Sequence, residues 1–254
     1  MYNGPTDGIV LANKRGGVGS AGVVHRLKKA MNGQRCGHTG TLDRFAEGLM
    51  ILTVGRATSF SDLFLKLDKT YEVTIQLGIS TNTIDPHGTV TDSWSAERVA
   101  DFVRHRRGDI EAAVVGRKQQ TLQQPPVFAA IKQDGMRLSD RHRKGLDLEL
   151  KARPVNFYQS ECRSVSDSGE VTAFFSVSSG TYIRSAARDI GEELGIPAYV
   201  TQLRRMSVGR FSLSDEAVWS SLDDTPKILS LLDVFQDWQR LTVSNEIAKQ
   251  IVKS

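Results

Sequence analysis

Apolar residues recur along the chain with two different spacings, which predict a mixture of strands and helices. Continuous apolar runs predict a buried strand over residues 8–12 and a strand buried on both faces over residues 49–54. Strict alternation of apolar and polar residues predicts further strands over residues 70–77 and 171–177, each with one buried face. In the first of these two strands, Tyr71 lies on the apolar face.

Helices are predicted where apolar residues are spaced by three or four positions. Ser20 is expected to cap a helix with a basic outer face and an apolar face formed by Val23, Val24, Leu27 and Met31. Ser95 is expected to cap a second helix, which ends in the basic run 104–107. Other helices are predicted over residues 58–67, over residues 185–194, in a short segment ending near Leu203, and over residues 244–253.

The 254 residues can bury a substantial core, and we expect one main body with an insertion. The segment from Gln123 to Arg153 is rich in Lys and Arg, poor in large apolar residues and broken by glycines. It is either a solvated loop or an insertion that closes over a polyanion, and the recurrence of charge over one stretch favours the polyanion. The net charge of +4 and the isoelectric point near 9.1 permit an anionic partner.

Two cysteines, Cys36 and Cys162, cannot form a disulfide scaffold, and no Cys/His spacing is typical of a zinc site. The chain begins without a basic and apolar leader, and no apolar run approaches the length of a membrane span. We therefore expect a soluble, cytoplasmic protein that has no contact with membranes.

The stretch from Arg35 to Gly48 reads R-C-G-H-T-G-T-L-D-R-F-A-E-G and holds a carboxylate, Asp43, among glycines that permit sharp turns. Asp43 is either a nucleophile or acid/base in a cleft, with His38 facing the same space, or a turn aspartate that bonds its own backbone. Considered alone, this stretch favours the turn aspartate. Tyr71 has a similar pair of interpretations, since it can pack in the core or stack on a nucleic-acid base.

Four stretches together resemble the TruB-type tRNA pseudouridine-55 synthases, a branch of the pseudouridine synthases. They are G-H-T-G-T-L-D at residues 37–43, D-K-T-Y at residues 68–71, P-P-V-F-A-A-I-K-x-x-G at residues 125–135, and G-T-Y-I-R at residues 180–184 followed by L-R-R. The matches keep their order from Gly8 to about Phe211. The resemblance reverses the preference at Asp43, because it implies a catalytic aspartate.

The resemblance implies an α+β fold, in which a mixed, mainly antiparallel curved sheet is flanked by helices and crossed by a cleft, with a basic insertion at about 123–153. It implies one catalytic domain over residues 1–233 and a tail over residues 234–254 that holds no complete PUA domain. It also implies a reaction, the isomerisation of a uridine in the T loop of tRNA, at position 55, to pseudouridine. We expect no cofactor, no metal and no obligate protein partner, and we expect a monomer that binds the T stem-loop.

The same resemblance assigns three catalytic residues. Asp43 would be the nucleophile, Tyr71 would stack on the flipped uracil, and Arg184 would pair with the carboxylate of Asp43. A fixed arginine favours the ionised carboxylate in a pocket where burial alone would raise its pKa. A stacked base is out of reach, so it must be flipped out and held by an aromatic face.

Six further residues are expected to contact the substrate. Tyr182 and Leu203 would line the base pocket, and His38 would occupy the space that the extruded bases leave, near Asp85. Lys14, at the end of the first predicted strand, and Lys132, in the P-P-V-F-A-A-I-K motif, complete the expected set.

Three other functions are weighed against this one. The protein could be a pseudouridine synthase for another RNA, including a guide-dependent one, or an RNA chaperone that folds tRNA without chemistry. The chaperone is disfavoured because a binder gains nothing from a carboxylate aimed at phosphates. A glycoside hydrolase would need a second catalytic carboxylate, for which Asp85 is the nearby candidate.

Overall fold

The structure is a computed structural model of the chain. It describes residues 7–129, 132–133, 136–137, 150–221, 224–239, 242 and 244, and at residues 132–133 and 136–137 it describes the backbone alone. The expected helix over residues 244–253 and most of the basic insertion lie outside the described residues.

Within the described residues, nine strands form one sheet in the order β11-β12-β4-β13-β3-β1-β15, with β2 paired to β3 and β14 paired to β13. Only β3 and β13 pair in parallel, so the sheet is mixed and mainly antiparallel, as expected. The strands are β1 (Gly8–Lys14), β2 (Cys36–His38), β3 (Glu47–Val54), β4 (Lys69–Leu77), β11 (Phe157–Val165), β12 (Glu170–Val177), β13 (Ala198–Val208), β14 (Phe211–Ser212) and β15 (Leu229–Ser230).

Short strand pairs and helices surround this sheet. The pairs are β5 (Ile79–Thr81) with β6 (Val90–Ser93), β7 (Leu122–Gln123) with β10 (Arg153–Pro154), and β8 (Lys132–Gln133) with β9 (Met136–Arg137). The helices are α1 (Ser20–Ala30), α2 (Ser61–Leu65), α3 (Ala96–Gly116), α5 (Ile183–Leu194) and α6 (Leu231–Val234), with 3-10 turns η1 (Gly55–Phe60) and η2 (Arg117–Gln119). In the described part of the chain, no helix is both long and apolar enough to cross a membrane.

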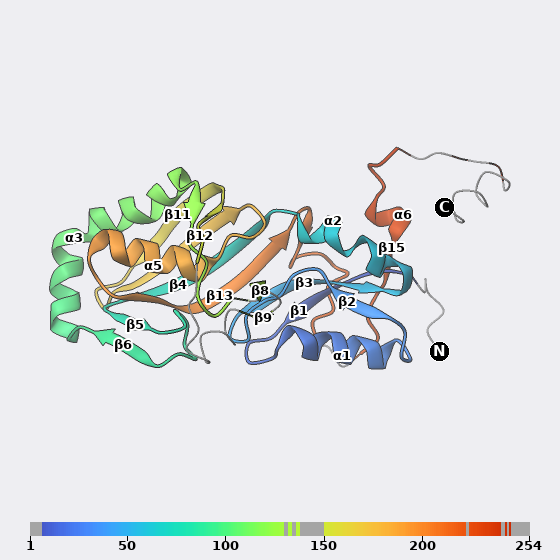
Figure 1. Ribbon diagram of the computed structural model, residues 1–254, viewed down its shortest axis with the longest axis horizontal. Helices are drawn as coiled ribbons and strands as arrows, with labels where there is room; N and C mark the ends of the chain where they lie inside the picture. Colours follow the sequence, from blue (N-terminus) through green and yellow to red (C-terminus); the bar gives the residue numbers. More distant parts are fainter. Residues whose placement is uncertain are drawn as a thin grey trace.

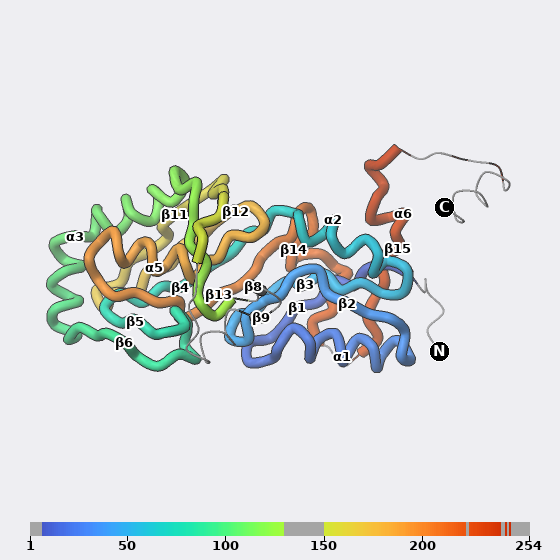
Figure 2. Tube along the Cα trace, viewed as in Figure 1, coloured from blue at the N-terminus to red at the C-terminus, as the bar shows by residue number. Residues whose placement is uncertain are grey.

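The helices gather at the two ends of an elongated body (Figure 1). At one end α1 lies against β1, β2 and β3, and at the other end α3 and α5 lie beside β4, β11 and β12. The long strands β4 and β13 run together through the middle, although they come from distant parts of the chain (Figure 2). The sheet therefore joins two helical layers and leaves a gap between them that loops occupy.

The strands β1 and β3 are buried on both faces, as their continuous apolar sequence predicts. One face, with Val10 and Leu52, packs against Val23 and Leu27 of α1. The other face packs into a second cluster with Phe64 of α2, Val208, Phe211 and Val234. Two apolar layers thus fix this half of the sheet and the loop between β2 and β3.

The strand β4 is buried on one face only, as its alternating sequence predicts. Tyr71, Val73, Ile75 and Leu77 are buried, whereas the residues between them are partly exposed. The strand β12 follows the same rule at Val171, Ala173, Phe175 and Val177. The buried face of β4 is the one that α5 covers, which brings Tyr71 next to the turn ahead of that helix.

Two predictions of helices are wrong. The segment ending at Leu203 is part of the strand β13, which pairs with β4 and shifts register after Val200, so that both Val200 and Leu203 are buried. The predicted helix over residues 58–67 is a 3-10 turn followed by the short helix α2, and Phe60 on its expected apolar stripe is 39% exposed.

Two helix ends also differ from the predictions. The cap of α1 is Gly19, and Ser20 is its first helical residue, with its hydroxyl turned to another segment. Ser95 caps α3 through Arg98 as expected, but this helix continues past the basic run to Gly116, with non-helical backbone angles at Arg106.

Gly48 is required where β3 and β13 run side by side. Its φ is +113°, and a Cβ atom there would lie 2.7 Å from the backbone nitrogen of Arg205 and closer still to its carbonyl oxygen. Gly48→Ala should therefore lower the free energy of unfolding by more than about 1 kcal/mol, measured by urea denaturation. Gly108→Ala is the control, since no atom lies within 4 Å of a Cβ there and alanine stabilises a helix by about 0.5–1 kcal/mol over glycine. Equal stability of Gly48→Ala and the wild type would contradict this packing.

Candidate active site

A cleft with a volume of about 500 Å³ lies on the α5 side of the sheet, where the Asp43 loop meets the turn before α5. Its walls are residues 40–43 and residues 178–184. Its floor is formed by strand residues of β4 and β13, namely Lys69, Tyr71, Leu203 and Arg205. The cleft brings together segments from four separate parts of the sequence.

Arg184 and Asp43 form a two-point ion pair at the base of this cleft. The Nε of Arg184 donates to Oδ2 of Asp43 at 2.8 Å, and its Nη2 donates to Oδ1 at 3.4 Å. The side chain of Arg184 is 3% exposed, whereas that of Asp43 is 36% exposed. The buried partner is therefore the arginine, and the carboxylate faces the opening in a fixed direction.

The other hydrogen bonds that Arg184 donates connect it to two further segments of the chain. Nη1 donates to the carbonyl oxygen of Thr83 at 2.8 Å, and Nη2 donates to that of Phe128 at 2.9 Å. Arg184 lies in the first turn of α5, where the helix dipole disfavours a cation, so these acceptors and Asp43 offset the local field.

The residues on both sides of Asp43 are held by hydrogen bonds. The hydroxyl of Ser20 donates to the carbonyl oxygen of Leu42 at 2.9 Å and accepts from its N–H at 3.0 Å. On the other side, the N–H of Gly17 donates to the carbonyl oxygen of Arg44 at 2.8 Å, and Nε of Arg44 donates to the carbonyl oxygen of Gly17 at 2.9 Å. The loop is therefore rigid at the position where it presents the carboxylate.

Lys14 is a buried support of this loop and has no access to a substrate, contrary to the expected role. It is 0% exposed, and its Nζ donates to the carbonyl oxygens of Arg15, Val18 and Arg44. Burial lowers the pKa of Lys14 to about 8, although the charge of Asp43 opposes this shift. The ammonium reaches three carbonyls, so it has no donor left for RNA.

Tyr71, Leu203 and Tyr182 all line the cleft, although Leu203 lies on a strand and not on the predicted helix. Tyr71 and Leu203 are 8% and 6% exposed and form the cleft floor. No described residue hydrogen-bonds the hydroxyl of Tyr71. Tyr182 precedes α5, its N–H donates to Oε1 of Gln123 at 2.8 Å, and burial raises the pKa of its hydroxyl. A planar ring can therefore be held between an aromatic floor and an aromatic wall.

Asp85 supports Arg184 from behind and does not line the cleft, contrary to the expected substrate contact. Its Oδ2 lies 3.5 Å from Nη1 of Arg184, and its Oδ1 accepts from the Thr83 hydroxyl at 2.7 Å and from the His87 N–H at 3.0 Å. Its side chain is 11% exposed. A carboxylate engaged in this way is not free to act as the second acid of a glycoside hydrolase.

His38 and Lys132 are the two remaining candidates. His38 lies on β2 opposite Leu52 and is not among the residues that line the cleft. Burial, with a smaller effect of the Arg205 charge, lowers the pKa of His38, so its neutral form is favoured. Its Nδ1 is buried without a hydrogen-bond partner among the described residues. The side chain of Lys132 lies outside the described residues, so its role stays a prediction.

Two residues of the cleft floor were not among the expected site residues. Arg205 follows the L-R of the L-R-R motif, and Lys69 belongs to the D-K-T-Y motif. Strand alternation around Leu203 would have placed Arg205 on the cleft face. The sequence predicts a helix that ends near Leu203 and a basic strand from Arg204, so it does not place Leu203 and Arg205 on one strand.

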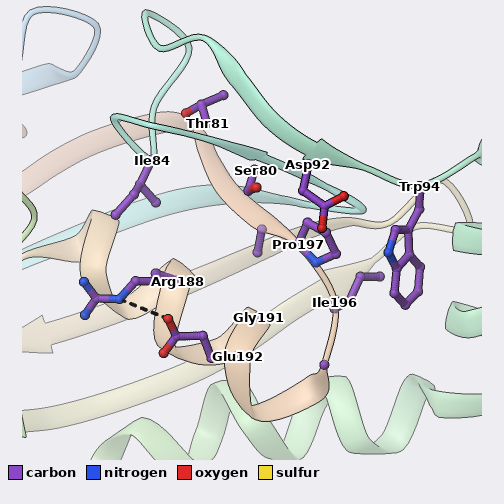
Figure 3. A pocket seen from close by; sticks show the side chains of 12 residues that line it. Ser80, Thr81, Ile84, Asp92, Trp94, Arg188, Gly191, Glu192, Ile196 and Pro197 are labelled. Carbon is purple, nitrogen blue, oxygen red and sulfur yellow. Dashed lines mark ion pairs between the residues drawn. The ribbon is translucent and has the colours of Figure 1, made fainter.

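A second hollow lies between the β5–β6 hairpin and the C-terminal end of α5, and it holds none of the expected site residues (Figure 3). Arg188 and Glu192 face each other across its lower wall at 3.7 Å, and Arg188 also bonds Asp189 at 2.7 Å. Arg188 thus already pairs with two carboxylates of its own helix. The first cleft holds the Asp43 carboxylate, which is fixed by Arg184, and we take this cleft as the candidate active site.

The arrangement in this first cleft suits nucleophilic chemistry on a flat, uncharged ring. A held carboxylate faces the opening, and apolar and aromatic side chains line the space before it. Such a carboxylate can attack a ring or sugar carbon and form a covalent intermediate. Isomerisation at a glycosidic bond needs such a nucleophile and a surface that keeps the detached base in place.

The chain is similar to pseudouridine synthases in sequence and in fold. The family described as TruB family pseudouridylate synthase (N terminal domain) matches residues 28–183. The tRNA pseudouridine synthase B of Corynebacterium jeikeium (strain K411) is 36% identical over 231 residues, which cover 89% of this chain and 74% of that protein. The one of Aquifex aeolicus (strain VF5) is 37% identical over 213 residues, 84% of this chain and 71% of that protein.

Solved structures agree on the fold. The structure of a Cbf5-Nop10-Gar1 complex matches with a TM-score of 0.59 and 24% identity, over 86% of this chain and 53% of that chain. The archaeal box H/ACA sRNP Nop10-Cbf5 complex matches with a TM-score of 0.58 and 23% identity, over 88% of this chain and 55% of that chain. This chain thus spans about half the length of the solved chains it matches.

The fold is that of the pseudouridine synthases, a class of isomerases, as the four motifs predict. Within this class, the chain belongs to the TruB family of pseudouridylate synthases.

Replacing Arg184 tests the geometry of its ion pair with Asp43. Arg184→Lys keeps the positive charge but removes the planar guanidinium. A lysine ammonium cannot donate to both carboxylate oxygens and to two carbonyl oxygens at once. Because misplacing a reacting group by about 1 Å can cost roughly 100-fold in rate, kcat should fall by about this factor, while the Kd for substrate RNA should change far less. The control is Arg188→Lys, one turn further along α5 and outside the cleft. Equal losses of kcat and affinity in Arg184→Lys would show that this arginine only holds RNA.

Proposed function

We propose that this protein converts a uridine in the T loop of tRNA, at position 55, to pseudouridine, with Asp43 as the nucleophile. The observation that carries the proposal is the Asp43 carboxylate, which is clamped on both sides and paired with a buried arginine at a cleft floored by Tyr71. The names of the relatives, tRNA pseudouridine synthase B, support tRNA as the substrate. The proposed site of action is the cytoplasm.

The proposed roles follow from the positions of the side chains. Asp43 attacks the flipped nucleotide, Tyr71 stacks on the uracil, and Leu203 and Tyr182 close the pocket around it. Arg184 holds the carboxylate in position through two hydrogen bonds. Flipping the base costs a few kcal/mol, which contacts to the RNA backbone must offset.

The catalytic unit that we propose extends over residues 1–233, and the basic insertion at about 123–153 contacts the RNA. The base of this insertion is anchored by β7 and β10, and Phe128 bonds Arg184, so RNA contacts there are next to the nucleophile. A monomer is sufficient, because the residues in the proposed roles belong to one chain.

A binding role without chemistry is less well supported by the same observations. A pure RNA chaperone has no use for an ionised carboxylate that is held at the opening of a positively charged cleft, where it would repel phosphates. Action on another RNA is tested by the choice of substrate.

The direct test is tritium release from a T stem-loop RNA labelled at the uracil 5-position, since moving the glycosidic bond to C5 displaces that hydrogen. The wild type should release tritium, and Asp43→Asn should release none, because the amide is a poor nucleophile. Filter binding should show the same RNA affinity for both proteins within a few fold. Binding by the wild type without release would favour a chaperone or another RNA target.

RNA binding should weaken steeply with salt. Each phosphate that the protein neutralises contributes about 0.7 to 0.9 to the slope of log K against log salt concentration. Replacing Arg141 and Arg143 with Gln should reduce the slope of the wild type by about 1 to 2. The control is Arg104→Gln, whose side chain is 72% exposed on α3 and pairs with Asp101. An RNA affinity that does not depend on salt concentration would contradict the proposal that the basic insertion binds phosphates.

A further inference from the structure

The floor of the cleft holds a buried cation that the proposed mechanism does not use. Arg205 is 3% exposed and lines the cleft, and its Nε donates to the carbonyl oxygen of Leu49 at 2.7 Å. None of the carboxylates in the described ranges lies within 4 Å of its guanidinium. Burying a charge without an opposite partner is costly, so an anion that arrives with the substrate would relieve this cost.

The position of Arg205 is set by the pairing of β13 with β4. Arg205 lies directly opposite Tyr71, and residues opposite each other in an antiparallel pair project from the same face. A Cβ atom on Gly40 would lie 3.9 Å from Nη1 of Arg205, so this nitrogen lies beside the loop that carries Asp43. The guanidinium is therefore located between the proposed stacking ring and the nucleophile loop.

The neighbouring arginine provides a natural contrast. Arg204 is opposite Glu72 in the pairing of β13 with β4, and its Nε lies 3.8 Å from Oε1 of Glu47. Its side chain is 46% exposed, on the sheet face away from the cleft. The two arginines of the L-R-R motif thus have different environments, because one is exposed near a carboxylate and the other is buried at the cleft without one.

A second cation strengthens the positive potential at Arg205. Lys69 is 7% exposed, lines the cleft, and lies two residues before Tyr71 on the same face of β4. Its Nζ donates to the carbonyl oxygen of Leu65, the last residue of α2, at 2.6 Å, and to that of Leu67. Burial, with a smaller effect of the Arg205 charge, lowers the pKa of Lys69 to about 8.

We propose that Arg205, with the charge of Lys69 behind it, binds the RNA backbone phosphate next to the flipped uridine and so fixes the ribose over Asp43. This proposal rests on the proposed function, because it requires RNA in the cleft. A phosphate fits better than the base, since Tyr71 and Leu203 already supply the flat and apolar surfaces that a uracil requires. The planar fork of an arginine matches two phosphate oxygens at once.

The test combines a neutral RNA linkage with substitutions in the protein. A T stem-loop RNA is made with a single methylphosphonate, which carries no charge, at the linkage 5′ or 3′ of the target uridine. Values of kcat/KM from tritium release are then measured for the wild type, Arg205→Gln and Arg204→Gln on each RNA.

With unmodified RNA, Arg205→Gln should lower kcat/KM about 10- to 100-fold, the effect of losing one charge-assisted hydrogen-bonded contact. A methylphosphonate at one of the two linkages should lower kcat/KM of the wild type by a similar factor. The two changes together should cost little more than either alone, because they remove the same contact. Arg204→Gln should change kcat/KM less than about twofold and should combine additively with the neutral linkage.

The wild type alone also tests the proposal, so a folding defect in Arg205→Gln does not hide the outcome. If neither neutral linkage affects the wild type, or if the losses are additive at both linkages, Arg205 does not bind a phosphate and its role is structural or toward the base. If the wild type turns over unmodified RNA but the losses from Arg205→Gln and the neutral linkage are additive, the phosphate contact is contradicted and the proposed function is not. No turnover of unmodified RNA by the wild type contradicts the proposed function and, with it, this contact.

Discussion

The guanidinium of Arg184 is the interaction on which the rest of the cleft depends. It donates to both carboxylate oxygens of Asp43, in the loop after β2. In the turn after β5 it donates to the Thr83 carbonyl and pairs with the Asp85 carboxylate. It also donates to the Phe128 carbonyl, at the base of the insertion. Three segments that are distant in sequence therefore meet at one buried cation. The same guanidinium therefore holds both the Asp43 carboxylate and Phe128, at the base of the insertion.

Charge is distributed unevenly around this point. Lys14, Lys69 and Arg205 are buried beneath the cleft, while the carboxylates of Asp43 and Asp85 are both directed at Arg184. The free protein carries the cost of these buried cations, which a polyanion can offset as it binds. A site of this kind is prepared for a negatively charged backbone and a neutral base, which is the combination that RNA offers.

The strands β1, β3, β4 and β12 and the helix α5 could be predicted from the sequence, because apolar spacing reports burial directly. The strand β11 was not predicted, and part of β13 was predicted as a helix. The pairing of Arg184 with Asp43 could not be predicted from spacing, since 141 positions separate the two residues. It came from the resemblance to a family, and the side-chain geometry agrees with it. The residues whose expected roles were wrong, Lys14 and Asp85, are polar groups turned inward, and no local pattern distinguishes a buried support from a substrate contact.

The segment around Leu203 shows a second limit of sequence patterns. Its short apolar stretch fits a helix as well as a strand, and only the tertiary pairing with β4 decides. The predicted boundary after Leu203 also separated it from Arg205, although both residues lie on β13 and line the cleft. Ser20 was likewise expected to cap α1, whereas its hydroxyl clamps Leu42 from a position far along the chain.

The most direct measurement is a crystal structure of Asp43→Asn bound to a T stem-loop RNA. This account predicts that the target uridine is flipped out, that its uracil stacks on Tyr71, and that residue 43 faces the glycosidic bond while Arg184 still contacts it. A target uridine that remains stacked in the RNA, or that binds away from this cleft, would contradict the central claim that Asp43 is the nucleophile of a base-flipping isomerase.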